Sequence, residues 1–410
     1  MATAQHAGPP GQPNIGYTPD LDNYLARVKR RLGTESLPKS LPAGFPEQLK
    51  SDLVWTGEEV EKSYNWVQEL TEDELEDIEN GLLHFKSLNK PLGFITTETF
   101  PLPRLSPVLR EISRELHEGH GFKVLRGLPV TKHNREDIIA IYAGVSSHIA
   151  SLRGRQDHQY EGKPADVVLN HIKDLSTTAD AHRIGAPAYT TDKQVFHTDS
   201  GHIVSLFALD VAAEGGQSKL ASSWRVYNEL AATRPDLIRT LAEPWVVDGF
   251  GDPKKPYTER PLLYFQPASG SSPERMIIQY ARRTFTGFQA LHRSSDIPPI
   301  TEAQAEALDA LHFLAEKFAV GLDFRQGDVQ YVNNLSIFHA RDGFKDTPEQ
   351  QRHLLRLWLR DPELEWNIPG GLTDRFSKVY DDVAAEKQVF PLEPRIRSSS
   401  DGVLNKNERK

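Results

Sequence analysis

Residues 195–201 read Val-Phe-His-Thr-Asp-Ser-Gly, and residues 333–341 read Asn-Asn-Leu-Ser-Ile-Phe-His-Ala-Arg. His197 and Asp199 are two positions apart, so in an extended strand their side chains point to the same side. With His339 from the second segment they supply imidazole and carboxylate ligands. Such a set can occupy one face of an iron(II) ion and leave the other face open. A His-x-Asp triplet alone is common by chance, so the rest of the chain must decide.

A pair of arginines follows His339. Residues 352–360 read Arg-His-Leu-Leu-Arg-Leu-Trp-Leu-Arg, which predicts a strand. Arg352 and Arg356 then share one face, roughly 13 Å apart at about 3.3 Å per residue. A guanidinium group can hold a carboxylate through two parallel hydrogen bonds. The pair therefore indicates two anionic ligands or one long dianion in a cavity, with surface arginines on an edge strand as the alternative.

A glycine turn forms the third motif. Residues 215–223 read Gly-Gly-Gln-Ser-Lys-Leu-Ala-Ser-Ser, and they follow the apolar run 203–209. This pattern predicts a strand, a turn and a second strand. Ser218 could donate its hydroxyl to a bound carboxylate, or it could be an ordinary strand serine.

The order of these motifs resembles the taurine dioxygenase/TfdA family, including its clavaminate-synthase-like members. The likeness runs from about Phe100 to Pro362. It implies an enzyme that uses Fe(II), 2-oxoglutarate and O2. The expected fold is α+β, with a double-stranded β-helix (jelly roll) core, flanking helices and a helical N-terminal extension.

The resemblance also implies roles for four of these residues. His197, Asp199 and His339 match the family's iron ligands. Arg352 matches the arginine that binds the far carboxylate of 2-oxoglutarate. These four side chains would form the catalytic and cofactor-binding core of the site.

Two further roles follow from the same resemblance. Ser218 stands where the family usually has threonine, so it would assist binding of 2-oxoglutarate. Arg356 matches an arginine that holds the substrate's acid group in some members and contacts the cosubstrate in others. The expected substrate is therefore a small anionic molecule, with a free amino acid or a secondary-metabolite precursor preferred. Hydroxylation, desaturation and oxidative cyclisation, each releasing CO2 and succinate, remain open.

Two other functions are compatible with the same residues. One is a jelly-roll binding or regulatory protein without turnover. The other is a zinc-dependent hydrolase that uses the same three ligands, since zinc also binds imidazole and carboxylate. The hydrolase leaves Arg352 without a purpose, and the intact set of ligands and arginines argues against a protein without turnover.

Composition supports a cytoplasmic enzyme. The chain has 410 residues, a net charge of −9 and no cysteine. A negative chain is a poor partner for nucleic acid, because phosphates need clustered cations. The lack of cysteine excludes disulfides and thiolate metal sites. No run of about 18 apolar residues is present, so no membrane span is expected. Composition leaves the oligomeric state open.

The chain divides into a single oxygenase domain and two tails. Residues 1–20 are rich in Ala, Gly, Pro and Gln and are expected to be a disordered tail. The domain is expected over 21–394, with 21–100 largely helical and 101–394 forming the jelly-roll core with insertions. Residues 395–410 are expected to be a flexible C-terminal tail.

Start signals predict three of the helices. Thr71 with Glu74 three positions later forms a capping box. Pro235 and Thr301 are predicted to open two further helices. The polar stretch 174–193 is long enough to be a lid over the site.

Overall fold

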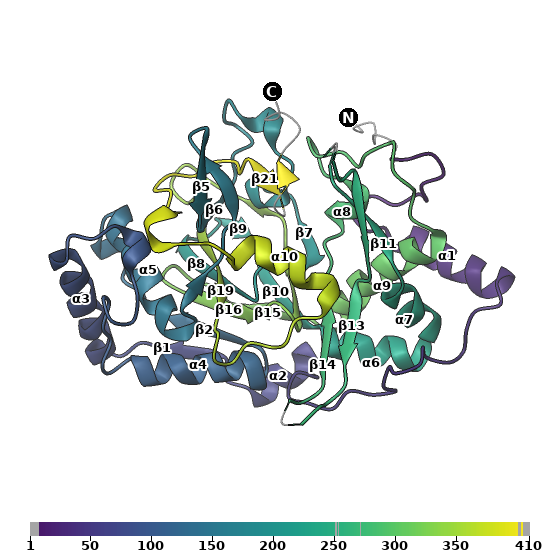
Figure 1. Ribbon diagram of the computed structural model, residues 1–410, viewed down its shortest axis with the longest axis horizontal. Coiled ribbons are helices and arrows are strands. Elements are labelled where there is room, and N and C mark those ends of the chain that lie inside the picture. The colour runs from purple at the N-terminus through teal and green to yellow at the C-terminus, as the bar shows by residue number, and fades with distance from the viewer. Residues whose placement is uncertain (1–7, 251, 253, 271, 401–402, 405–410) are drawn as a thin grey trace.

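The computed structural model describes residues 8–250, 252, 254–270, 272–400 and 403–404. Two β-sheets lie at the centre of the molecule, with helices on both sides of them (Figure 1). Both helices and strands are well represented, as the predicted α+β class requires. Within the described part of the chain no helix has the length and apolar character needed to cross a membrane.

The larger sheet carries the two predicted arginines. Its strands, in spatial order, are β1 (Val67–Glu69), β2 (Phe122–Arg126), β16 (Val329–Asn333), β8 (Ile203–Asp210), β19 (His353–Arg360) and β3 (Leu152–Arg153), and β6 (Leu169–Lys173) also pairs with β19. Strand β19 therefore has neighbours on both sides and is not an edge strand. Arg356 lies within β19, and Arg352 directly precedes it.

The smaller sheet carries the two histidines. It consists of β15 (Val320–Leu322), β10 (Ser218–Ser222), β17 (Ile337–Arg341) and β7 (Gln194–His197), all paired antiparallel. Short pairs surround both sheets: β11 (Trp245–Asp248) with β12 (Tyr257–Arg260), β13 (Leu263–Gln266) with β14 (Arg275–Ile278), β9 (Glu214–Gly215) with β18 (Phe344–Lys345), β21 (Ser399–Ser400) with β22 (Val403–Leu404), and β5 (Lys163–Val167) with β4 (Asp157–Tyr160) and β20 (Gln388–Val389).

Helices pack around the sheets. In the described part of the chain they are α1 (Leu21–Thr34), α2 (Gly57–Ser63), α3 (Glu72–Ser87), α4 (Ser106–Glu118), α5 (Arg135–Ile149), α6 (Ser223–Thr233), α7 (Pro235–Ala242), α8 (Arg283–Thr286), α9 (Glu302–Phe318) and α10 (Gly370–Tyr380). Short 3-10 turns occupy Leu92–Phe94, Val130–Lys132, Ala181–Arg183, Pro187–Tyr189 and Ala385–Lys387. Helix α4 packs on the larger sheet, and α9 packs on the smaller one (Figure 1).

The local signals that predicted helices and a turn are confirmed. Thr71 and Glu74 form a complete capping box at the start of α3. Helix α7 begins at Pro235, and Thr301 caps α9. At the predicted turn, Gly215 has φ of 76° and the following glycine has φ of 71°. Residues with a Cβ rarely adopt such angles, which is why glycine is used there.

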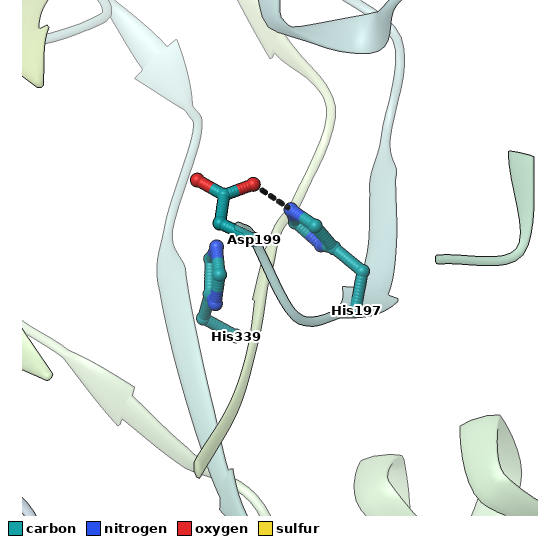
Figure 2. A group of neighbouring side chains, drawn as sticks. All are labelled: His197, Asp199 and His339. Carbon is teal, nitrogen blue, oxygen red and sulfur yellow. Dashed lines mark ion pairs between the residues drawn. The ribbon is translucent and has the colours of Figure 1, made fainter. Parts of the chain in front are cut away.

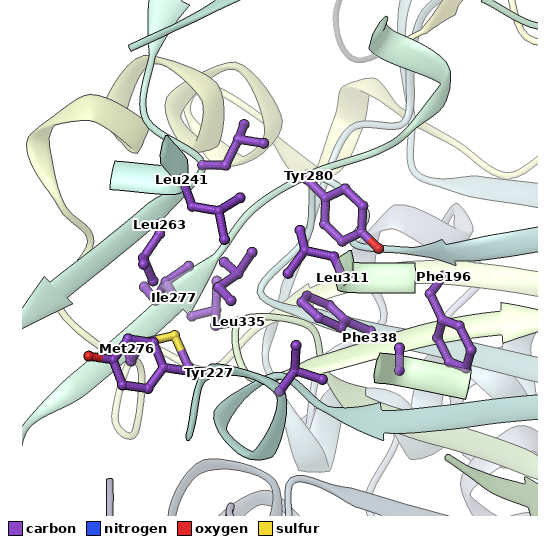
Figure 3. Close-up of a cluster of buried hydrophobic side chains, with 14 of the residues drawn as sticks. Phe196, Tyr227, Leu241, Leu263, Met276, Ile277, Tyr280, Leu311, Leu335 and Phe338 are labelled. Carbon is purple, nitrogen blue, oxygen red and sulfur yellow. The ribbon is translucent and has the colours of Figure 1, made fainter. Parts of the chain in front are cut away.

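Side chains along the strands alternate between the apolar cores and the candidate site. In β7 and β17, Phe196 and Phe338 point into an apolar cluster beneath the smaller sheet (Figure 3). The neighbouring His197 and His339 point to the opposite side, because successive strand side chains alternate. In β19, Leu355 and the other odd-numbered leucines pack on the helix-covered core of the larger sheet.

Side chains of both predicted tails contact the rest of the chain within the described residues. Within residues 8–20, the Gln12 side chain donates to the Phe285 carbonyl at 3.1 Å, and Tyr17 packs on the domain. Near the other end, Arg397 donates to a backbone carbonyl at 3.1 Å and is buried. These contacts join segments without helical or strand periodicity to the domain. Residues 1–7, 401–402 and 405–410 lie outside the described part.

Candidate metal centre and its two cavities

The three predicted metal ligands come together at the smaller sheet. His197 and His339 are cross-strand partners in the pairing of β7 with β17, and their ring centroids are 4.1 Å apart. Asp199 follows β7 by two residues and turns back toward both rings (Figure 2). One ligand atom from each residue lies within 4.8 Å of the others. A single metal ion could therefore contact all three.

Asp199 is held as an anion by the larger sheet. Its Oδ2 accepts hydrogen bonds from Arg356 Nη1 at 2.8 Å and from Trp358 Nε1 at 3.0 Å. Burial alone would raise the pKa of this carboxyl. Arg356 and the two nearby histidines outweigh burial, so the pKa of Asp199 lies well below its ordinary value.

Both histidines place a ring nitrogen in the group of atoms that could hold one metal ion. Burial and the neighbouring His197 lower the pKa of His339 to about 3, so His339 is neutral at physiological pH. His197 Nδ1 donates to the Val195 carbonyl at 2.9 Å, which fixes Nε2 as the atom that faces Asp199. The amide nitrogen of Gln194 lies 2.9 Å from that Nε2. Neutral imidazole is the form that binds metals.

A network of amides fixes the loop that carries Asp199. Asn334 Oδ1 accepts from the Asp199 backbone N–H at 2.8 Å, and Asn334 Nδ2 donates to the Asp199 carbonyl at 2.9 Å. Gln279 donates to the same carbonyl at 2.5 Å. Asn334 thus holds the backbone of the acidic ligand.

One cavity extends from the metal ligands toward Arg352. It is lined by Ile172, Ala188, Gln194, His197, Asp199, Leu206, Ser218, His339, Ala340, Arg341, Arg352, Leu354 and Arg356. We call it the strand cavity, since strands of both sheets form most of its wall. It contains all six residues that the sequence singled out.

The strand cavity fits a dianionic cosubstrate. Arg352 is buried, and its Nη1 has no hydrogen-bond partner among the described residues. Burial, followed by nearby Arg341, lowers the pKa of Arg352 to about 9, which leaves it cationic at neutral pH. A buried cation without a partner is costly, and a carboxylate would relieve that cost. Ser218 donates to Gln330 Oε1 at 2.7 Å, so its hydroxyl hydrogen is engaged by the protein.

A second cavity is lined by two of the three ligands, His197 and Asp199. It is lined by Tyr17, Ala186, Pro187, Ala188, Gln194, Val195, His197, Thr198, Asp199, Ala281, Arg282, Arg283, Arg356, Trp358 and Arg397. We call it the loop cavity, because loops and both chain ends supply much of its wall. Part of the proposed lid, 186–188, belongs to this wall. Four of the lining residues are arginines, and Asp199 is the only acid among them.

Arg356 lies between the two cavities and lines both. Its Nε donates to Gln156 Oε1 at 2.8 Å, while its Nη1 is directed to Asp199. Gln156 in turn donates to the Arg356 carbonyl at 2.8 Å. Arg356 thus contacts the carboxylate ligand directly, an interaction that sequence reasoning did not foresee.

The donor set decides which metals fit. Two imidazoles and one carboxylate suit iron(II), and also zinc, whereas calcium and magnesium prefer oxygen ligands alone. The chain has no thiolate that could take part. The three residues present therefore fit a divalent transition metal of the kind that the sequence predicted.

Comparison with known proteins agrees with this geometry. The model of the family "Taurine catabolism dioxygenase TauD, TfdA family" matches residues 88–358. A taurine hydroxylase-like protein, SAT17, from Stachybotrys chartarum is 37% identical over 358 residues, which cover 85% of this chain and 89% of the relative. An FR-33289 synthase from Streptomyces rubellomurinus is 23% identical over 75% of this chain and 88% of its own length.

Solved structures share the fold at low sequence identity. An asparagine oxygenase in complex with Fe(II), 2S,3S-3-hydroxyasparagine and succinate has a TM-score of 0.50 at 15% identity, covering 72% of this chain and 94% of that one. The non-haem iron oxygenase OrfP, in complex with Fe and alpha-ketoglutaric acid, has a TM-score of 0.50 at 17% identity, with the same coverage. The protein therefore belongs to the TauD/TfdA family and is a non-haem iron dioxygenase that depends on 2-oxoglutarate.

Proposed function

We propose that this dioxygenase oxidises a small acid, with iron(II) held by His197, Asp199 and His339. The observation that carries the proposal is that two of these clustered ligands, His197 and Asp199, line both cavities, while His339 lines the strand cavity. One cavity ends at the buried, unpartnered nitrogen of Arg352, and the other is rich in arginine. When bound, iron(II), 2-oxoglutarate and O2 supply the oxidising chemistry, and the protein supplies aim and seclusion.

The residues of the strand cavity would bind the cosubstrate. Arg352 Nη1 would donate to the far carboxylate of 2-oxoglutarate, and Arg341 would add positive charge beside it. Ser218 would support this end of the cavity through its hydrogen bond to Gln330. Because this wall consists of paired strands, the bound cosubstrate would be held rigidly against the metal ligands.

Arg356 would position the metal ligand Asp199, whose carboxylate it contacts. The substrate would occupy the loop cavity, where several arginines favour an anion. We further propose that the two sheets form the two halves of a double-stranded β-helix, since they enclose the site between them. We propose a free amino acid or a secondary-metabolite precursor as this anion, since the arginines of the cavity favour an acid group.

A zinc hydrolase is the weaker alternative. Its three ligands would be the same, and a zinc-bound water would need only one open position. It gives no reason for the buried Arg352 at the end of a second cavity. Formation of succinate distinguishes the two functions, because hydrolysis consumes no 2-oxoglutarate.

The experiment is an aerobic screen of small acids with iron(II) and 2-oxoglutarate. Taurine, L-arginine, L-asparagine and other α-amino acids would be offered beside their neutral esters or amides, with His339→Ala as the inactive control. Succinate and product mass would be measured for each compound. We expect succinate to form in proportion to oxidised product for at least one acid and not for its neutral analogue. Efficient oxidation of neutral compounds alone would reject an acidic substrate.

A further inference from the structure

We propose that Tyr17 and Arg282 together bind the acid group of the substrate in the loop cavity. This inference rests on the proposed function, since it assigns the anchor of that function's substrate. Tyr17 lies outside residues 88–358, the part of the chain that matches the family model. An N-terminal segment outside the family match would thus complete the substrate site.

Arg282 has one nitrogen that the protein leaves for a ligand. It is 2% exposed and lines the loop cavity. Its Nη2 donates to Asp309 Oδ1 at 2.6 Å, and its Nε donates to the Gly16 carbonyl at 2.8 Å. The remaining Nη1 is buried and has no hydrogen-bond partner among the described residues. A buried donor without a partner costs stability, and an anionic oxygen at Nη1 would remove that cost.

Tyr17 supplies a second donor, and it directly follows Gly16, whose carbonyl Arg282 binds. Its hydroxyl oxygen accepts the Val195 N–H at 3.2 Å, and its ring contacts Phe288 edge-on with centroids 4.8 Å apart. No described residue accepts the hydroxyl hydrogen of Tyr17. Burial raises the pKa of Tyr17 to about 12 despite the neighbouring arginines, so the hydroxyl keeps its proton at neutral pH. It is therefore available to donate to an oxyanion.

The segment that leads to Tyr17 is anchored at two backbone carbonyls. Gly16 is held by Arg282, and the Asn14 carbonyl accepts from Arg27 Nη2 at 2.8 Å. Arg27 also pairs with Asp309 at 2.6 Å, the same carboxylate that holds Arg282. One buried carboxylate thus fixes both Arg282 and the N-terminal segment. The two donors would be in place before a substrate arrives, which lowers the entropic cost of binding.

The anchor also lies near the metal ligands. Tyr17 binds the N–H of Val195, whose carbonyl accepts from the ligand His197. Arg356 is directed to Asp199, which leaves the acid group of a substrate to other donors in the loop cavity. An acid held at Tyr17 and Arg282 would extend the rest of its carbon chain toward the metal ligands.

The test measures anion binding without turnover. Protein loaded with Zn(II) and saturated with 2-oxoglutarate would be titrated with methanesulfonate and with acetate, and binding would be followed by ligand-observed NMR. The variants are Tyr17→Phe and Arg282→Lys, which keeps the charge beside Asp309. Tyr24→Phe is the matched control, because Tyr24 lies on α1 and stacks on Phe313 away from the cavity. Thermal unfolding would verify that each variant is folded.

We expect Tyr17→Phe to weaken binding of at least one probe by about tenfold, the typical worth of a hydrogen bond to a charged group. Arg282→Lys should weaken it at least as much, and Tyr24→Phe should leave it unchanged. Equal affinity in Tyr17→Phe and wild type, or no binding of either probe to wild type, would overturn the inference.

The outcomes separate this inference from the proposed function. If wild type oxidises an acid in the screen and Tyr17→Phe has the same KM for it, the inference fails and the function stands. If no acid yields succinate but probe binding depends on Tyr17 and Arg282, the anion site stands and the function fails.

Discussion

The strand cavity and the loop cavity share the metal ligands His197 and Asp199 but are built differently. In the strand cavity, Ser218, Arg341 and Leu354 come from β10, β17 and β19, whose backbones are paired on both sides. In the loop cavity, Tyr17 and Arg397 come from opposite ends of the chain. The first cavity has a wall that backbone pairing fixes, whereas single side-chain contacts fix much of the second.

The strand cavity and the loop cavity also differ in how far they fall within the family match. The strand cavity lies almost entirely within residues 88–358, the range that matches the family model. The loop cavity draws Tyr17 and Arg397 from outside that range. A reaction common to all members needs one rigid geometry, and recognition of different substrates needs walls that can vary. The four predictions that follow test this division, beginning with the largest effect.

Removing a metal ligand should disable both cavities at once. Loss of a residue that hydrogen-bonds to a metal ligand typically lowers metal affinity by about 10- to 100-fold. Loss of the ligand itself should lower the affinity further. We expect His339→Ala to bind iron(II) too weakly to form succinate above the protein-free level. The control is His84→Ala, since His84 is exposed on α3. Wild-type succinate formation by His339→Ala would contradict the assignment.

Removing Arg352 should affect the strand cavity alone. Loss of a charge-assisted partner in a buried pocket costs about 2–5 kcal/mol, or roughly 30-fold to several-thousand-fold in affinity. We expect Arg352→Gln to raise the Kd of 2-oxoglutarate by such a factor and to leave iron(II) affinity near the wild-type value. Calorimetric titration of both ligands would measure this. An unchanged Kd for 2-oxoglutarate would mean that the cosubstrate binds elsewhere.

Trp358→Phe should weaken the metal centre by an intermediate amount. The substitution keeps an aromatic ring and removes the indole N–H that donates to Asp199 at 3.0 Å. We expect iron(II) affinity to fall by about tenfold, the lower end of the range for loss of a residue that hydrogen-bonds to a metal ligand. Trp366→Phe is the control, because its indole N–H donates to the His117 carbonyl instead. Equal metal affinity in both variants would show that the hydrogen bond from Trp358 to Asp199 does not contribute to metal binding.

Ser218→Ala should have the smallest effect. Ser218 donates to Gln330, and a neutral hydrogen bond of this kind is worth about 0.5–1.5 kcal/mol. We expect the KM for 2-oxoglutarate to rise by roughly two- to tenfold, and Ser218→Thr to restore the wild-type value. A rise as large as that in Arg352→Gln would indicate direct contact between the hydroxyl and 2-oxoglutarate.

Sequence reasoning found the parts of the site that depend on local spacing. His197 and Asp199 share a short motif, and the period of two along β19 placed Arg352 and Arg356 on one face. The contact of Arg356 with Asp199 joins residues 157 positions apart, and that of Tyr17 with Val195 joins residues 178 positions apart. No local pattern encodes such pairings, because they depend on how whole segments pack.

The lack of a local pattern is also the reason why the sequence predicts disordered or flexible tails at both chain ends. Residues 8–20 have no helical or strand period, and periodicity is the main signal of order in a single sequence. Their order comes from partners such as Arg282, which is distant in the sequence. Capping boxes, by contrast, are encoded within four residues, and those at α3 and α9 follow directly from the sequence.

The most direct test of two separate cavities around one metal is a crossed comparison of Arg352→Gln and Arg282→Lys. In Zn(II)-loaded protein, the Kd would be measured for 2-oxoglutarate and, with 2-oxoglutarate saturating, for methanesulfonate. We expect Arg352→Gln to raise the Kd of 2-oxoglutarate strongly and that of methanesulfonate little. We expect Arg282→Lys to show the reverse pattern. Equal weakening of both ligands by either variant, or the opposite pattern, would contradict the division of the site into a cosubstrate side and a substrate side.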